Sequence, residues 1–197
     1  APVDTRPLEP FFIVRKKGEA MKAVVVEQIG SFSIREIEIP KVSPEEVLVR
    51  VQVTGLCRTD LKIVRVGHRD LVLPRVPGEE VVGVIEEIGA EVSRFRTGQR
   101  VYVYPGTSCG VCDACRHGAG NLCASMQIMG FHRDGGFAEY VCAPQVSLIP
   151  IPDRLPDDVA ILAEPLSCCL NALERAALKP GDCVGVWGSG PAGTLIR

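Results

Sequence analysis

Short runs of valine and isoleucine that alternate with polar residues dominate the chain after Met21. Alternation with a period of two places one side of each run in a core and the other in solvent, which is typical of β-strands. Glycine and proline between the runs mark turns. Six strands at this close spacing indicate a closed or nearly closed β-barrel. The expected strands span residues 22–28, 31–39, 46–53, 80–88, 99–105 and 136–144.

A helical pattern is weak until residues 156–182, where apolar positions recur at helical spacing. Asp157 and Asp158 stand near the start of this helix, and Lys179-Pro180-Gly181 ends it. The sequence therefore predicts a mainly β protein with some α-helix.

The first twenty residues follow a different pattern from the rest. Residues 1–20 show no sustained periodicity, and Met21 after them resembles a natural start. We expect residues 1–20 to be an extension, upstream read-through or a cloning-derived arm. A genuine N-terminal arm is the alternative.

Composition and charge exclude several classes of function. Hydrophobic residues make up 46% of the 197 and charged residues 23%, which is ordinary for a globular protein. The net charge of −2 and the 5% of aromatic residues give no sign of a nucleic-acid partner or an anionic membrane surface. No apolar run approaches the ~18 residues that span a bilayer. The nine cysteines, an odd number, favour a reducing compartment, so we expect a soluble cytoplasmic protein.

The strongest chemical signal is the segment CGVCDACRHGAGNLC. Cys109, Cys112, Cys115 and Cys123 have spacings of two, two and seven residues. Four thiolates on one short loop satisfy a tetrahedral zinc ion with no open position, so this zinc would be structural. Free buried thiols or an iron–sulfur cluster are the alternatives, although the proline that follows the last cysteine in ferredoxins is missing. With four sulfurs in the shell, His117 is expected to be a surface residue of the loop.

The second signal is the glycine-rich segment GSGPAG. It follows an expected buried strand at residues 183–188 and opens an expected helix, as a dinucleotide site requires. Glycines in this pattern allow a tight turn and close approach of a pyrophosphate. A plain glycine-rich turn is the alternative, and the chain ends before the acidic residue expected ~20 positions further on. The candidate cofactor-binding residues are Gly188, Gly190, Pro191 and Gly193.

Two adjacent glutamates raise a third question. Glu79 and Glu80 follow a Pro-Gly turn and open an apolar strand, although charges rarely enter a core without a partner. Earlier in the chain, GLCRTD places Cys57, Thr59 and Asp60 after a strand. These three residues fit a metal ligand with a proton carrier and a supporting carboxylate, or merely a buried thiol and a turn.

Taken in order, these motifs resemble those of the zinc-containing medium-chain alcohol dehydrogenases, nearest to the sorbitol and threonine dehydrogenase-like branch. The resemblance runs from Met21 to Ile196 and includes GLCRTD, PGEEVVGVIEEIG, TGQRVYV, the four-cysteine lobe, DGGFAEY, LAEPLSCCLNAL and KPGDCVGVWGSGPAG. It implies a GroES-like catalytic domain over residues 21–176, with a zinc lobe at 105–125. It also implies the beginning of a truncated Rossmann domain at 177–197.

The resemblance also implies an activity. In this family a catalytic zinc binds the substrate oxygen, and hydride passes between an alcohol or polyol (or its carbonyl product) and NAD or NADP. The partner is then a small molecule, and a full-length relative would form a homo-oligomer. Because most of the nucleotide site is missing, we expect this chain to be inactive alone.

The resemblance assigns roles to six residues by position. Cys57 matches a zinc ligand, Glu164 supplies or neighbours a further ligand, Glu80 is the glutamate of a G-H-E motif, Thr59 passes the substrate proton, Asp60 orients the ligand histidine, and Arg58 matches a pyrophosphate-binding arginine.

The chain departs from the family pattern at one ligand, because Glu79 stands where the family has the metal-binding histidine. A carboxylate oxygen binds zinc at about the same ~2.0–2.2 Å distance as imidazole. Together with Cys57, Glu80 and Glu164 it would place four negative charges around the ion, with Asp60 behind them. Two such charges ~4 Å apart repel by about 4 kcal/mol at an effective dielectric of 20. We expect either altered metal binding with a weaker Lewis acid, or an empty pocket with one carboxyl protonated.

Three further residues bear on this site. Lys62 replaces a histidine that relays protons in many relatives, and we interpret it as a solvated charge or a counter-ion. His68 is expected to be a loop residue that could swing in as a ligand, and His132 has no assigned role.

Two other functions compete with the dehydrogenase. One is a non-catalytic zinc-stabilised domain, which the exchange at Glu79 favours. The other is a zinc-free quinone or enoyl reductase, which is disfavoured because those relatives lack the cysteine lobe.

Overall fold

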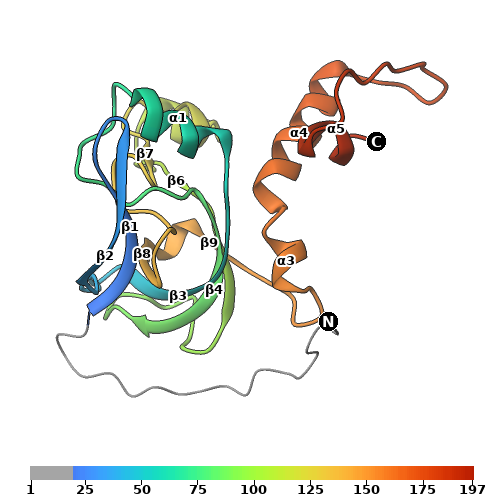
Figure 1. The fold of residues 1–197 in the computed structure, drawn as a ribbon. Helices are drawn as coiled ribbons and strands as arrows, with labels where there is room; N and C mark the ends of the chain where they lie inside the picture. Colours follow the sequence, from blue (N-terminus) through green and yellow to red (C-terminus); the bar gives the residue numbers. More distant parts are fainter. Residues whose placement is uncertain (1–19) are drawn as a thin grey trace, which may run out of the picture.

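The computed structural model describes residues 20–197, and their strands curve around one side of a shared core (Figure 1). The predicted extension at residues 1–20 lies outside the described residues, apart from Ala20, which begins strand β1 (Ala20–Gln28). All six strands predicted from the alternating pattern form, each within a few residues of its expected limits.

The strands form a nearly closed antiparallel barrel. β1 pairs with β2 (Ser31–Glu38), and five further strands pair in the order β8-β3-β4-β5-β9. A bridge between Ala23 and Ala138 joins the β1-β2 hairpin to the larger sheet. The strands of that sheet are β3 (Glu46–Gly55), β4 (Glu80–Ile88), β5 (Arg100–Val103), β8 (Tyr140–Pro144) and β9 (Leu148–Pro150).

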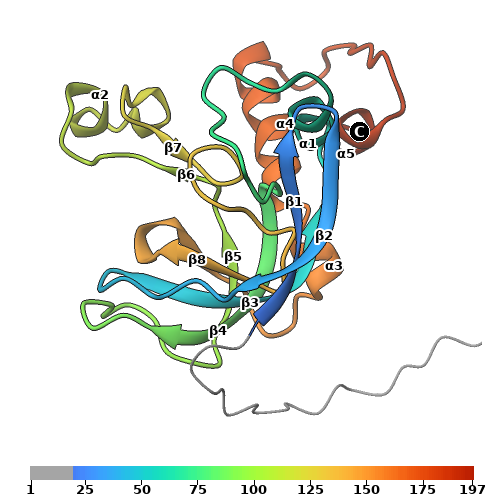
Figure 2. The same ribbon diagram turned by 60° about the vertical axis from the view of Figure 1, so that its left-hand side comes forward.

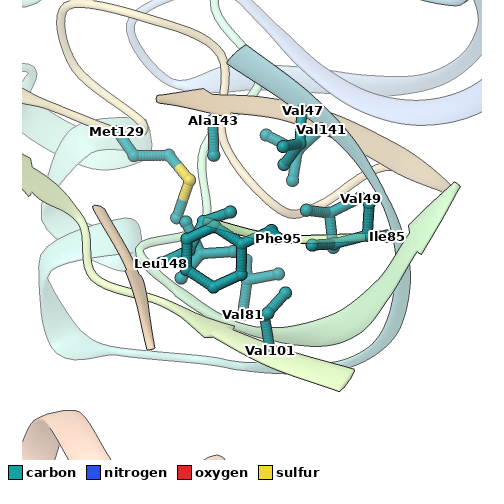
Figure 3. Packing of buried hydrophobic residues seen from close by; sticks show 11 residues of the cluster. Val47, Val49, Val81, Ile85, Phe95, Val101, Met129, Val141, Ala143 and Leu148 are labelled. Atoms are coloured by element: carbon teal, nitrogen blue, oxygen red, sulfur yellow. The ribbon is translucent and has the colours of Figure 1, made fainter. Parts of the chain in front are cut away.

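Alternate residues of these strands fill the barrel (Figure 3). On β5, Val101 and Val103 point inward, whereas Tyr102 faces the opposite side with Val82 of β4, its partner in the strand register. This outer face packs against residues near the third helix. The interior cluster consists of Val47, Val49, Val81, Ile85, Phe95, Val101, Val103, Met129, Val141, Ala143 and Leu148.

Two smaller features extend from the barrel. Helix α1 (Arg58–Val66) crosses one end of it (Figure 1). The cysteine lobe projects from the body (Figure 2) and is made of short pieces of structure. These pieces are β6 (Gly106–Thr107), α2 (Asp113–Arg116), the 3-10 turn η1 (Gly120–Leu122) and β7 (Gln127–Ile128), and a second 3-10 turn, η2 (Gln145–Ser147), follows β8.

The predicted C-terminal helix forms as two helices, α3 (Asp157–Ala160) and α4 (Ala163–Ala176). Pro165 explains the interruption, because its nitrogen carries no hydrogen for the carbonyl of Ile161 and its ring crowds that carbonyl. Arg100 of β5 holds α3 against the barrel through an ion pair with Asp157 and hydrogen bonds to three carbonyls of the preceding loop.

The predicted buried strand at residues 183–188 is wrong. The segment is irregular, Trp187 on it is fully exposed, and a five-residue helix, α5 (Pro191–Leu195), follows. A strand depends on hydrogen bonds to a neighbour, and no strand within residues 20–197 pairs with this segment. In Figure 1 it forms the extended loop between α4 and α5.

Candidate metal and cofactor sites

The sulfur atoms of the four lobe cysteines converge. Cys112 Sγ lies 3.4 Å from Cys115 Sγ and 3.9 Å from Cys123 Sγ, and Cys109 Sγ lies 4.0 Å from Cys115 Sγ. All four lie within 4.8 Å of one another. Zn–S bonds of ~2.3 Å in a tetrahedron separate the sulfurs by about 3.8 Å. The four cysteines therefore fit a structural zinc ion, as their spacing predicts.

The lobe has almost no core of its own. Between residues 106 and 128, Cys123 is the one buried residue, and the apolar side chains of Val111 and Leu122 are exposed. The backbone N–H groups of Val111 and Cys112 donate to Cys109 Sγ and lower the pKa of that thiol to about 6. A metal ion bound by the four sulfurs can replace the missing apolar contacts.

Asp60 organises a second candidate site at the start of α1. Its Oδ2 accepts the backbone N–H of Cys57 at 2.8 Å, and its Oδ1 accepts the N–H of Gly78 at 3.0 Å. Cys57 is the N-cap residue of the helix, and its sulfur accepts the N–H of Thr59 at 3.5 Å. Asp60 is only 1% exposed. It therefore fixes the Cys57 loop against the turn that precedes Glu79.

Two glycines make room for this arrangement. Gly78 has a φ of 104°, which a residue with a side chain adopts only with strain. Gly55 on β3 lies opposite Glu80, and a Cβ there would overlap the Glu80 carboxylate. Glu80 thus extends across β3 and not into the barrel.

The carboxyl groups of Asp60, Glu79, Glu80 and Glu164 lie in one neighbourhood and form the acid cluster. Burial, followed by the charges of Asp60, Glu164 and Glu80, raises the pKa of Glu79 from 4.5 to about 7. Burial, then Glu164 and Asp60, also raises the pKa of Glu80. Glu79 Oε1 is buried and has no hydrogen-bond partner in the described part of the chain. A neutral Glu79 is the electrostatic response expected of this cluster without a cation.

Helix α4 brings two groups to the same neighbourhood. Glu164 lies in its first turn, and Cys168 Sγ donates to Glu164 Oε1 at 3.6 Å. From the barrel, Tyr102 contributes a buried hydroxyl whose pKa is raised by burial and then by Glu164, Glu80 and Cys168. We did not predict Tyr102 or Cys168 as site residues. The four-residue spacing from Glu164 to Cys168 within a predicted helix was a usable signal for the second.

The second site offers donors that suit a divalent ion, although its ligand atoms do not converge as those of the lobe do. A thiol, several carboxyls and an unpartnered buried oxygen form a ligand set that suits zinc. Among residues 20–197, the four lobe cysteines form the only group of at least three His, Cys, Asp or Glu ligand atoms within 4.8 Å. The structure therefore brings Glu79, Glu80 and Glu164 near one another without assembling a complete shell.

The glycine-rich segment forms a turn that leads directly into α5. Gly188 has a φ of 110°, Gly190 is the N-cap residue and Pro191 occupies the first helical position. A Cβ on Gly193 would overlap the carbonyl of Gly188, so the third glycine permits close contact between turn and helix. Arg58, the proposed pyrophosphate ligand, is exposed at the first position of α1.

The remaining candidates lie outside the acid cluster. Lys62 is exposed on α1. The ring of His68 packs edge-on against Phe131, with ring centroids 5.0 Å apart, and His132 Nδ1 accepts the Ile128 N–H. His117 is exposed and bonds to the carbonyl of Asp113. Each histidine therefore has a local contact, and none of the three approaches Glu79 within hydrogen-bonding distance.

Comparison with known proteins gives consistent matches. The family model described as "Alcohol dehydrogenase GroES-like domain" matches residues 43–153. A sorbitol dehydrogenase from Bacillus subtilis (strain 168) is 35% identical over 179 residues, which cover 89% of this chain and 51% of the relative. The chain spans about half the length of the curated relatives it matches.

Two solved structures have the same fold over most of the chain. A short chain alcohol dehydrogenase from Escherichia coli CFT073 in complex with NADH has a TM-score of 0.84 and 39% identity, covering 91% of this chain and 52% of its own. A protein described as a zinc-binding dehydrogenase from Sinorhizobium meliloti 1021, bound to NADP, has a TM-score of 0.84 and 37% identity, covering 90% and 52%. No helix in residues 20–197 of the present chain is long and apolar enough to cross a membrane.

Proposed function

Because the chain belongs to the zinc-containing alcohol dehydrogenase family with a GroES-like domain, we propose that it supplies the metal and substrate side of a zinc-dependent oxidoreductase. The reaction is hydride transfer between a nicotinamide cofactor and an alcohol or polyol, or the reverse from its carbonyl product. The observation that carries this proposal is a buried carboxyl oxygen of Glu79 that has no hydrogen-bond partner. It lies just before β4, near the carboxyl groups of Asp60, Glu80 and Glu164.

The candidate ligands of the second metal ion come from three places in the fold, and a catalytic zinc that keeps one position open for the substrate takes three of them. They are Cys57 at the start of α1, Glu79 and Glu80 at the start of β4, and Glu164 in the first turn of α4. When bound, a divalent zinc ion would polarise the substrate oxygen. Since Glu79 adds a negative charge where the family has a neutral imidazole, the ion would polarise that oxygen less strongly than in relatives.

Two residues beside the ligands have roles that do not depend on the metal geometry. The hydroxyl of Thr59 lies 3.5 Å from Cys57 Sγ and is the proposed carrier of the substrate proton. The carboxylate of Asp60 holds the backbone of this loop in place. In this chain it acts through two N–H groups and not through a histidine ring.

We propose NAD or NADP as the cofactor, with the pyrophosphate at the turn formed by Gly188, Gly190, Pro191 and Gly193 and near Arg58. The proposed division is a catalytic domain at residues 21–176 with its zinc lobe at 105–125, and the start of a nucleotide-binding domain at 177–197. We also propose a cytoplasmic location, because nine free cysteines require reducing conditions, and a homo-oligomer for the whole protein.

Metal content tests the proposal. Purified, reduced protein loaded with zinc should hold two ions per chain, one in the lobe and one at the acid cluster. Cys57→Ser and Glu164→Gln should each lower the content towards one, whereas the exposed control Glu174→Gln should leave it at two. One zinc ion per chain in the unaltered protein would contradict the proposed catalytic zinc site.

A second candidate function is a non-catalytic domain that zinc stabilises only through the lobe. It is supported by the glutamate at position 79 and by the incomplete convergence of the second ligand set. The Glu79→His variant separates the candidates. A rise in zinc content from one to two on this change would indicate a degenerate site, whereas two ions before and after would indicate a working one.

A further inference from the structure

Cys168 and Glu164 have the separation of two ligands on one zinc ion. They lie one helical turn apart on α4, and Cys168 Sγ is 3.6 Å from Glu164 Oε1. With Zn–S of ~2.3 Å and Zn–O of ~2.1 Å, two corners of a tetrahedral shell lie about 3.6 Å apart. The pair therefore has the spacing of one edge of a zinc shell.

A second observation on the facing strand points to a missing ligand at the same place. Tyr102 is 3% exposed, and its hydroxyl has no hydrogen-bond partner within the part of the chain that the structure describes. Its titratable neighbours are Glu164, Glu80, Cys168 and Glu79. A buried hydroxyl left unpaired costs roughly 1–3 kcal/mol. The cost is small only where a bound group, such as a metal ion with its ligands, interacts with the hydroxyl.

We propose that Cys168 is one of the three protein ligands of the metal ion held at Glu164, so that the second site contains two thiolates, Cys57 and Cys168. This inference rests on the proposed function, because it concerns the same metal. On binding, the thiol of Cys168 releases its proton to solvent and its sulfur forms a bond to the ion.

The second thiolate accounts for a chemical feature of the site. The exchange of histidine for Glu79 leaves Cys57 as the one sulfur in a ligand set otherwise made of oxygen, which weakens the preference for zinc over hard ions such as Mg²⁺. An added sulfur shifts the preference back towards zinc or Co²⁺. Cys168 also lies on a different element from Cys57, so the ion would join α4 to the barrel.

The simpler interpretation of the pair is a weak S–H···O contact between two side chains on a helix surface, since Cys168 is exposed. Such a contact would not respond to metal. Exposure makes Cys168 easy to test, because its replacement removes no buried group and its reagent access is open.

Alkylation tests the assignment directly. Metal-stripped protein is treated with iodoacetamide, with and without zinc chloride at two equivalents, and each cysteine is quantified by peptide mass spectrometry. Zinc should slow modification of Cys168 at least tenfold. The exposed Cys183, which lies in the loop before the glycine turn, should react at the same rate in both samples and serves as the internal control.

The outcome at Cys57 separates this inference from the proposed function. Protection of Cys168, with or without Cys57, supports the inference. Protection of Cys57 alone overturns the inference and leaves the proposed metal site standing. Protection of neither residue, while the lobe cysteines are protected, overturns both.

Cobalt substitution gives an independent measurement. With both sites filled, six sulfurs bond to Co²⁺, so Cys168→Ser should reduce the sulfur-to-cobalt absorption band by about one sixth. Cys183→Ser should leave the band unchanged. An unaltered band in Cys168→Ser would overturn the proposal.

Discussion

The carboxylate of Asp60 accepts the backbone N–H of Gly78 at 3.0 Å, although the two residues are 18 positions apart. The same carboxylate accepts the N–H of Cys57. One buried side chain therefore sets the position of the thiol at the start of α1 relative to the glutamates at the start of β4. Two of the proposed ligand-bearing segments are fixed to each other before any metal binds.

Asp60→Asn should lower the free energy of unfolding by about 1–3 kcal/mol, because an amide retains one acceptor oxygen and leaves one backbone N–H unpaired. Urea denaturation of the metal-free protein measures the change. Asp158→Asn, an exposed acid-to-amide control on α3, should alter stability by less than about 0.5 kcal/mol. Equal losses of unfolding free energy in the two variants would show that the two hydrogen bonds of Asp60 do not stabilise the fold.

Glu79 should make the stability of the metal-free protein depend on pH. Its pKa in the folded state, about 7, is above its usual 4.5, so between these values the folded protein binds more protons than the unfolded chain. The free energy of unfolding should therefore fall as pH rises from about 4.5 to 7, and then level off. Because the group is partly exposed, we expect a fall on the order of 1–2 kcal/mol, less than the whole shift would give.

Glu79→Gln isolates this contribution. The difference in unfolding free energy between the variant and the unaltered protein should grow across that pH window and be constant above it. Glu174→Gln, which changes an exposed acid, is the matched control. A difference that stays flat from pH 4.5 to 7.5 would mean that the Glu79 carboxyl is not shifted.

Tyr102→Phe should leave the metal-free protein as stable as before or raise its free energy of unfolding by about 1 kcal/mol, because it removes an unpaired buried hydroxyl and keeps the ring. Thermal and urea unfolding at pH 7 measure the change. Tyr104→Phe is the control, since Tyr104 is 43% exposed. A loss of more than 1 kcal/mol in the Tyr102 variant alone would reveal a partner for that hydroxyl.

Loss of zinc from the lobe should be a local event. Cys112→Ser removes one of four sulfurs, so the content should fall by one ion and amide hydrogen exchange should accelerate within residues 106–128. The valine-rich core strands should keep their protection from exchange. Only one residue of the lobe is buried, so the packing of the barrel does not depend on the lobe. Cys183→Ser should change neither quantity. Global unfolding of the Cys112 variant would contradict a separable lobe.

The parts of the fold that depend on local patterns were predictable from the sequence. The valines of β5 and most of those of β3 alternate along the chain and point into the barrel, as expected, although Leu48 and Tyr102 on the opposite face are buried as well. The cysteine spacing also predicted four converging sulfurs from local sequence, because four ligands within fifteen residues can meet on one short loop. Pro165 was also a readable signal for the division between α3 and α4, although we predicted one helix.

Features that depend on distant neighbours were not predictable. The segment at residues 183–188 has the composition of a buried strand, yet a strand needs a partner to form. The contact of Asp60 with Gly78 requires the path of the whole loop between them. Tyr102 joins the acid cluster only because the register pairs it with Val82 and because its face of the sheet is covered by a later helix.

One diffraction experiment tests the central claim most directly. Crystals of the protein grown with zinc would be measured on both sides of the zinc absorption edge, and the anomalous difference map would locate each ion. The account predicts two peaks, one among the four lobe sulfurs and one between Glu164 and the Glu79-Glu80 turn. A single peak in the lobe, with the carboxylates free of metal at full zinc loading, would contradict it.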